Sequence, residues 1–234
     1  MVFNENSTHG RPYWASLTAP PTGAGVHGSD QACLARGFAL DTSMYDLPLL
    51  ESWNIALFKL LHGTAQMPAA LLTATTWLAE VPAYAAALLM LRYVVRSKDF
   101  TCLFSLTLAL VSARCAKILI GLYAYHDRPF AAGYGPALID HAADHSMPSS
   151  HVTFVLVLAV ICATRGQWRL TSLLFLLGGV MAWARVFVGV HWPLDMLGAV
   201  VVAVACGLFG AGVLQLCASV GGMSRRFWRR PLSP

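Results

Sequence analysis

Charged residues are scarce in this chain of 234 residues, where Asp, Glu, Lys and Arg together make up 12%. An ordinary soluble domain carries roughly 25% charged residues. Hydrophobic residues make up 57% of the chain and gather in several long runs, as in segments that cross a bilayer. The composition therefore excludes an ordinary soluble domain and predicts one membrane-embedded domain.

Paired cysteines are also missing. None of the six cysteines forms a CxxC pair, and five lie in or beside apolar segments, where cysteine acts as a small apolar side chain. This argues against a disulfide framework or a cysteine zinc site. A cleavable signal peptide is not expected, because the first apolar run begins far from Met1. The net charge of +5 comes from short clusters beside apolar runs, which is typical of membrane topology and argues against nucleic-acid binding.

The chain divides into three regions. Residues 1–47 are rich in Gly, Pro, Thr, Ser and Asn and lack helical periodicity, which predicts a polar, disordered N-terminal extension. Residues 48–222 hold the apolar runs and predict an all-α, multi-span transmembrane bundle of about five to six spans with interfacial helices. Residues 223–234 are rich in arginine and predict a basic cytoplasmic tail.

Within the bundle, residues 50–62 show helical spacing but are too short to span, which predicts an interfacial helix. Two apolar blocks, 67–78 and 81–95, meet at Glu80-Val81-Pro82; the first predicts an interfacial or re-entrant segment and the second a span. The predicted span at residues 152–163 would gain length if its helix begins near Pro148, since proline favours the first helical turn. The remaining predicted spans cover residues 100–125, 152–163 (the one that Pro148 would extend), 170–190 and 194–220.

Basic residues predict the topology. Connectors at 92–98 and 165–169 and the C-terminal tail all carry Arg or Lys, and the positive-inside rule places such segments in the cytoplasm. The loop from Arg128 to Met147, and the His191 end of its helices, then lie on the outer face. An odd number of spans with an outer N-terminus, or one extra span, both remain open.

Residues suited to chemistry fall at this outer end. His191 and Asp195 are four apart, so on a helix they share one face. A carboxylate there fixes the tautomer of the imidazole and leaves the opposite nitrogen free as base or nucleophile. Arg185, near the end of the preceding helix, offers a planar fork of donors that matches phosphate oxygens.

A second cluster opens the helix after the long loop. Ser149 and Ser150 stand where free backbone N–H groups and the helix dipole attract anions. His151 follows within a turn and is placed to protonate a leaving oxygen, and Arg128 adds a fixed positive charge. Each signal alone has an ordinary explanation as a cap, an anchor or a solvated side chain. Together on one face, they predict a pocket for a phosphoryl group.

These motifs resemble the three signatures of the type 2 phosphatidic acid phosphatase superfamily, which also includes vanadium haloperoxidases. The matching residues are Arg128-Pro129, Pro148-Ser149-Ser150-His151, and Arg185 with His191 and Asp195. The resemblance covers roughly residues 48–220 and implies that 48–222 form a membrane-embedded lipid phosphatase domain. Within this superfamily, the chain is most similar to the bacitracin-resistance type of undecaprenyl-diphosphatase. The residues that carry this narrower resemblance are Arg128-Pro129-Phe130, Leu138, His141-Ala142-Ala143-Asp144 and Ser146.

The resemblance also implies roles. His191 is similar to a nucleophile that forms a phosphohistidine, oriented by Asp195, and His151 to the acid that protonates the leaving group. The phosphate-binding groups would be Arg128, Arg185, Ser149 and the amide near Ser150. No metal or other cofactor is implied. The implied activity is hydrolysis of undecaprenyl diphosphate at the outer face of a bacterial inner membrane.

Three positions depart from the family pattern. Ala184 replaces a usual Ser and Ser150 a usual Gly, and Gly121 stands where the family has Lys. Lys117 lies on the same helix face as Gly121 but about 6 Å deeper, a depth that snorkelling nearly covers. Lys117 is therefore a candidate phosphate contact, with pairing to an Asp or a backbone carbonyl as the alternative.

Other readings remain open at this point. The substrate of the same chemistry would alternatively be phosphatidic acid, phosphatidylglycerol phosphate or lipid A, so the partner is a polyprenyl or glycerolipid phosphate in the bilayer. A non-enzymatic anion-binding membrane protein and a vanadate-dependent haloperoxidase are further alternatives. Histidine and aspartate residues in and beside the long loop could bind a metal ion, but the favoured interpretation is that they shape the site for the diphosphate head group. These residues are Asp140, His141, Asp144, His145 and His151. Oligomeric state is not predicted.

Overall fold

The structure, a computed structural model, describes residues 48–64 and 66–220. The predicted disordered extension and basic tail lie outside these residues. Within them the chain forms helices and no strands, so the predicted all-α fold is confirmed. The helices are α2 (Pro48–Leu61), α3 (Ala69–Ser97), α4 (Thr101–Tyr123), α5 (Ser150–Thr164), α6 (Trp168–Phe187) and α7 (Pro193–Val220).

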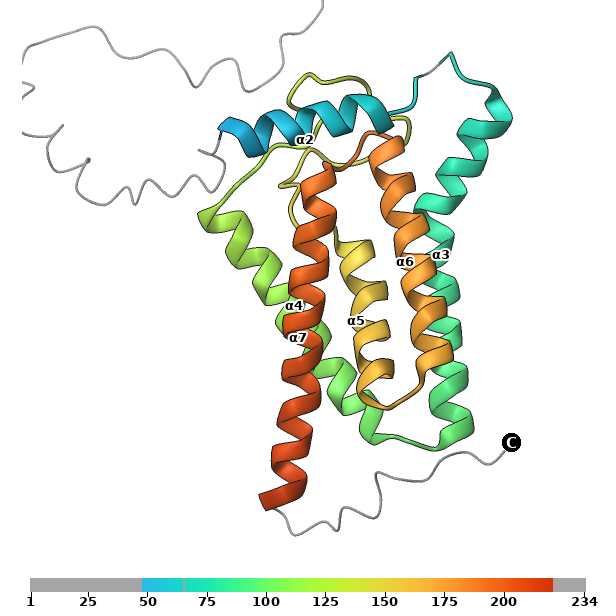
Figure 1. Cartoon of the computed structure of the whole chain (residues 1–234), viewed down its shortest axis with the longest axis vertical. Helices are drawn as coiled ribbons and strands as arrows, with labels where there is room; N and C mark the ends of the chain where they lie inside the picture. The colour runs from blue at the N-terminus through green and yellow to red at the C-terminus, as the bar shows by residue number, and fades with distance from the viewer. Residues whose placement is uncertain (1–47, 65, 221–234) are drawn as a thin grey trace, which may run out of the picture. The chain divides into compact units, whose positions relative to one another are not determined.

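Four of the described helices, α3, α4, α6 and α7, are long and apolar enough to cross a membrane. Helix α5 has 15 residues, or roughly 22 Å, and is shorter than a bilayer core of about 30 Å. It lies in the centre of the bundle (Figure 1), and ten of its residues are buried. Because protein surrounds α5, its length need not match the bilayer, and its N-terminus begins deeper than the neighbouring ends of α6 and α7 (Figure 1).

The predicted interfacial helix is α2, which lies across one end of the bundle (Figure 1). The side chain of Asn54 is buried, and its Oδ1 accepts a hydrogen bond from the backbone N–H of Leu194 at 3.1 Å. That N–H belongs to the first turn of α7, where backbone donors lack partners within the helix. Phe58, also buried, packs against Trp192 with ring centroids 5.1 Å apart. These contacts attach α2 to the start of α7.

The predicted division of residues 67–95 into two elements is wrong. Both apolar blocks belong to α3, a single helix of 29 residues with Pro82 inside it. Proline removes one helical N–H and disturbs the preceding turn, but a membrane helix continues through it when neighbouring groups satisfy the freed carbonyls. Pro82 leaves the carbonyl of Leu78 without its helical N–H, and at the adjacent carbonyl, that of Ala79, Nη1 of Arg185 donates a hydrogen bond at 3.2 Å. The first block is therefore the beginning of a span, not a re-entrant segment.

Small residues let α7 approach its neighbours closely. A Cβ on Gly210 would lie 2.5 Å from the carbonyl oxygen of Ser105, and one on Gly207 would lie 2.6 Å from the side chain of Val160. Glycine at such points allows membrane helices to pack tightly against one another. This packing fixes the middle of α7 against α4 and α5.

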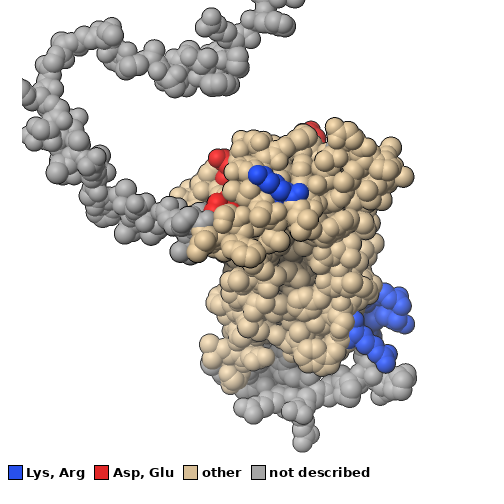
Figure 2. All heavy atoms as spheres, turned by 45° about the horizontal axis from the view of Figure 1, so that its top comes forward, with Lys and Arg blue, Asp and Glu red and all other residues tan. Residues whose placement is uncertain are grey.

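Basic residues gather at the end of the bundle opposite α2. The α3–α4 and α5–α6 turns lie together there (Figure 1), joined by an ion pair between Arg165 and Asp99. Blue side chains cluster toward this end on the face that Figure 2 shows. The exposed basic residues at this end are Arg92, Arg96, Lys98 and Arg169. The two basic connectors that the sequence assigns to one side of the membrane thus lie at one end of the molecule.

Candidate active site

The predicted site residues meet at the α2 end of the bundle. They come from four parts of the chain: the last half of α4, the loop that leads to α5, the first turn of α5, and the α6–α7 turn. All of these segments reach the same end of the molecule (Figure 1). The residues concerned are Lys117, Arg128, Ser149, Ser150, His151, Arg185, His191 and Asp195.

His191 and Asp195 form a buried pair. Nδ1 of His191 lies 3.1 Å from Oδ2 of Asp195, although His191 stands in the turn before α7 instead of on the helix. The same carboxylate oxygen accepts hydrogen bonds from the backbone N–H of Trp192 at 2.8 Å and from the hydroxyl of Ser146. A proton on Nδ1 that donates to Asp195 leaves the lone pair on Nε2. The pair therefore presents Nε2 as the reactive nitrogen.

The charge state of His191 favours that role. Complete burial, followed by the positive charges of Arg185 and Arg128, holds the pKa of His191 well below its usual value of 6.5. The cationic imidazole is disfavoured because it would be desolvated beside other cations. At neutral pH the ring is therefore neutral and Nε2 is available for attack or proton abstraction.

Arg128 stands next to that nitrogen. Its Nη1 lies 3.2 Å from Nε2 of His191 and donates to the carbonyl of Val190 at 2.7 Å. Its Nε and Nη2 bind Oδ1 of Asp144 at 2.8 and 2.7 Å. Partial burial alone would raise the pKa of Asp144, but the hydrogen bonds and charge of Arg128 lower it below its usual value. Asp144 thus stays ionised and holds the guanidinium in place.

Arg185 supplies a second buried guanidinium from the last turn of α6. Besides its bond to Ala79, its Nη2 lies 3.1 Å from Nε2 of His141, whose ring centroid is 6.3 Å from that of His191. Burial, with added effects of Arg128 and Arg185, lowers the pKa of His141. A neutral His141 accepts from Arg185. The Nε of Arg185 is buried and has no partner among the described residues, so this donor remains free for an anion.

The start of α5 provides neutral donors. Ser149 is the N-cap residue of α5 but makes no side-chain cap hydrogen bond, and its Oγ is buried without a partner among the described residues. The ordinary capping explanation for this serine therefore does not hold. His151 lies in the first turn of α5 and is exposed. The groups close enough to act on it electrostatically are Arg185, His141, Lys117 and Arg128.

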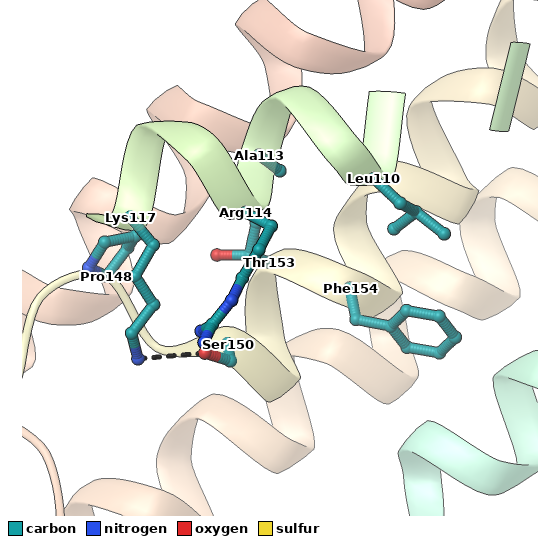
Figure 3. Close-up of a pocket in the computed structure, with 8 residues that line it drawn as sticks. All are labelled: Leu110, Ala113, Arg114, Lys117, Pro148, Ser150, Thr153 and Phe154. Atoms are coloured by element: carbon teal, nitrogen blue, oxygen red, sulfur yellow. Dashed lines mark hydrogen bonds between the residues drawn. The ribbon is translucent and has the colours of Figure 1, made fainter. Parts of the chain in front are cut away.

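Lys117 reaches the same region from deeper in α4. Its side chain is buried, and Nζ donates to Oγ of Ser150 at 2.9 Å (Figure 3). The side chain therefore extends toward the end of α4 that carries the site, as predicted for snorkelling. It bonds to a serine hydroxyl, and not to an Asp or a backbone carbonyl as in the alternative prediction. At Gly121, where the family carries its lysine, an added Cβ would lie 2.6 Å from the ring of His145. The imidazole of His145 thus fills the space that a side chain at 121 would need.

Some contacts were not predicted from the sequence. Ser146 was noted only as part of the family resemblance, yet its hydroxyl binds Asp195, 49 residues further along the chain. Asp144 and His141 were expected to shape a head-group site, with metal binding as the alternative, and the structure shows them bonded to Arg128 and Arg185. A clue was available in the dense run of polar residues before Met147. Among the described residues, no group of three or more His, Cys, Asp or Glu side chains is arranged to hold a metal ion.

This fold and site define a class, the membrane-embedded lipid phosphatases, and the comparisons with known proteins agree. Residues 100–217 match the model of the PAP2 superfamily. The chain therefore belongs to the PAP2 superfamily and is a multi-pass membrane hydrolase of the lipid phosphatase type.

Two relatives are similar over most of their length. "Putative undecaprenyl-diphosphatase YbjG" of Escherichia coli (strain K12) is 35% identical over 157 residues, which cover 64% of this chain and 77% of that protein. "Undecaprenyl-diphosphatase BcrC" of Bacillus subtilis (strain 168) is 30% identical over 156 residues, covering 66% and 80%. In fold, the chain resembles a transmembrane PAP2 type phosphatidylglycerolphosphate phosphatase from Bacillus subtilis, with a TM-score of 0.56, 15% identity, and coverage of 76% and 89%.

Proposed function

We propose that this protein hydrolyses undecaprenyl diphosphate to undecaprenyl phosphate and inorganic phosphate at the outer face of a bacterial inner membrane. The observation that carries the proposal is the buried His191, whose Nδ1 lies 3.1 Å from Oδ2 of Asp195 and whose Nε2 lies 3.2 Å from Nη1 of Arg128. A nucleophile beside a fixed guanidinium is what phosphoryl transfer requires. The names of the two relatives support the diphosphate substrate.

The reaction proceeds in two displacements. Nε2 of His191 forms a bond to the terminal phosphorus while the bridging P–O bond breaks, and the imidazolium form of His151 gives its proton to the leaving undecaprenyl phosphate oxygen and becomes neutral. The carboxylate of Asp195 stabilises the positive charge that the imidazole gains. A water molecule then gives a proton to His151, its oxygen attacks the phosphorus, and the N–P bond breaks to release inorganic phosphate.

Charge on the transferred group is neutralised by groups fixed before the substrate arrives. Arg128 and Arg185 are both buried and held by hydrogen bonds, so little reorganisation is needed during the reaction. Ser149 Oγ and the free N–H groups of α5 add donors, and Lys117, bonded to Ser150, adds a cation for the second phosphate of the diphosphate.

The outward orientation rests on charge asymmetry. The site lies at the α2 end of the bundle, opposite the exposed arginines and lysine of the α3–α4 and α5–α6 turns (Figures 1 and 2). Positively charged connectors stay in the cytoplasm, and this supports a site at the outer leaflet.

Phosphate release by the purified full-length protein tests the proposal. With a chelator present, the wild type is expected to release phosphate from undecaprenyl diphosphate in preference to phosphatidic acid, phosphatidylglycerol phosphate and lipid A, and His191→Ala is expected to release none. Equal release by both proteins would remove the activity from this site. Activity that a chelator abolishes and zinc or magnesium restores would overturn the metal-free mechanism. Preference for a glycerolipid phosphate would overturn the substrate.

A further inference from the structure

Arg114 lies inside a membrane span and has no hydrogen-bond or ion-pair partner in the part of the chain that the structure describes. It stands on α4, nine residues before the helix ends at Tyr123, which is roughly 13 Å along the axis. Its side chain is exposed and makes no hydrogen bond or ion pair with the described residues. An arginine at such depth is costly unless it meets an anion or a polar cavity. The catalytic scheme above makes no use of it.

Arg114 lines a hollow between α4 and the start of α5 (Figure 3). In this view its side chain and that of Lys117 both extend toward Ser150. Leu110 and Phe154 form the apolar part of the same hollow. One hollow therefore combines two cations and a hydroxyl with an apolar wall, which suits the junction of a phosphate and a hydrocarbon chain.

The hollow continues from the proposed catalytic site. Lys117, which lines the hollow, is close enough to interact electrostatically with Arg128 as well as with Arg114, so it connects the hollow to the reactive centre. Away from His191 and deeper along α4, the cations are thus Arg128, Lys117 and Arg114. A diphosphate carries two adjacent anionic groups, and this series offers separate cations to each.

We infer that Arg114, with Lys117 and Ser150, binds the phosphate that remains on the lipid and so sets a preference for diphosphate over monophosphate substrates. The inference rests on the proposed function. The terminal phosphate meets Arg128 and Arg185 at His191, while the proximal phosphate lies in the hollow and the first prenyl units contact Leu110 and Phe154. A lipid monophosphate that reacts at His191 has no second phosphate for Arg114.

Farnesyl diphosphate and farnesyl phosphate provide a matched pair of probes, because they differ only in that second phosphate. For the full-length protein in detergent, Arg114→Gln is expected to lower kcat/KM on the diphosphate by about tenfold or more, the effect of losing a hydrogen bond to a charged group. On the monophosphate the change should stay under about twofold. Arg114→Lys should recover part of the loss, because it keeps the charge. Arg92→Gln, at an exposed position near the opposite end of α3, is the control and should change neither rate.

Each outcome bears on a different claim. An equal loss on both substrates, or no loss on either, overturns the inference while leaving the proposed function intact. Poor folding of Arg114→Gln would also give an equal loss, and in that case the diphosphate-to-monophosphate ratio of Arg114→Lys decides. A ratio equal to that of the wild type, with both rates reduced, counts against the inference. If the wild type hydrolyses no polyprenyl diphosphate at all, both the proposed function and this inference are wrong.

Discussion

Nη1 of Arg128 and Nε2 of His191 face each other at 3.2 Å in the buried end of the bundle. The arginine reaches this position because its other donors are occupied by Asp144 and by the carbonyl of Val190. Under the proposed mechanism, the contact places a permanent cation beside the phosphoryl oxygens when Nε2 approaches phosphorus. It also opposes protonation of the imidazole. In the proposed mechanism, one residue thus serves both the nucleophile and the phosphate.

Arg128→Lys should lower kcat/KM by about a hundredfold or more with the fold unchanged. An ammonium group lacks the planar fork that joins Asp144, Val190 and the phosphate at the same time, and loss of a fixed donor to the developing charge costs about this much. Initial rates on the diphosphate, together with circular dichroism and thermal unfolding in detergent, give the two readouts. A lysine variant with wild-type rates would show that charge alone is sufficient at this position.

Asp195→Asn should reduce turnover by at least about a hundredfold, because the imidazole loses both its orienting acceptor and the charge that stabilises its cation. The side chains have nearly the same size, so the helix start should remain intact. Ser146→Ala should have a smaller effect, since Asp195 keeps its hydrogen bonds from Trp192 and His191. Single-turnover formation of a phosphorylated protein would separate the two variants. Equal losses in both would place Ser146 in a larger role than positioning.

The acid limb of the pH–rate profile should lie well below pH 6.5. His191 attacks only as the neutral imidazole, and burial beside two arginines lowers its pKa below the usual 6.5. As pH falls, activity is therefore retained past 6.5 and lost only when pH passes through the lowered pKa. The profile of kcat/KM, which reports groups of the free enzyme, is the appropriate measurement. An acid limb centred at or above pH 6.5 would contradict the buried, neutral state of His191.

The sequence was sufficient to locate most of the fold and the main candidate residues. Five of the six described helices begin and end near predicted positions, because long apolar runs and a proline near a helix start are local signals. The sequence also predicted that Arg128, His151 and His191 lie at the same end of the bundle, because successive spans cross the membrane in alternating directions. The structure also places Ser149 and Ser150 at the start of α5, as predicted.

Other features depend on tertiary contacts. The continuity of α3 through Pro82 was missed because a proline reads locally as a boundary, while the bond from Arg185 to Ala79 spans 106 residues. The contact of Ser146 with Asp195 likewise joins distant positions. Lys117 was placed correctly because helical periodicity gives its face and depth. What fills the space beside Gly121 was not predictable, since His145 comes from a loop without periodicity.

That space yields a prediction opposite to the one expected from family resemblance. Gly121→Lys restores the residue usual at this position, yet an added Cβ would lie 2.6 Å from the His145 ring. We expect it to destabilise the protein by about 1–3 kcal/mol, as overpacking does, without raising activity. Thermal unfolding in detergent measures the change, and Gly179→Ala is the matched control, because a Cβ there meets nothing within 4 Å.

Combining Gly121→Lys with His145→Ala should recover stability, since it removes the ring that blocks the new side chain. If Gly121→Lys alone were stable and more active, His145 would have to move aside readily, and the loop before α5 would be more adaptable than its contacts with Met147 and Tyr125 indicate.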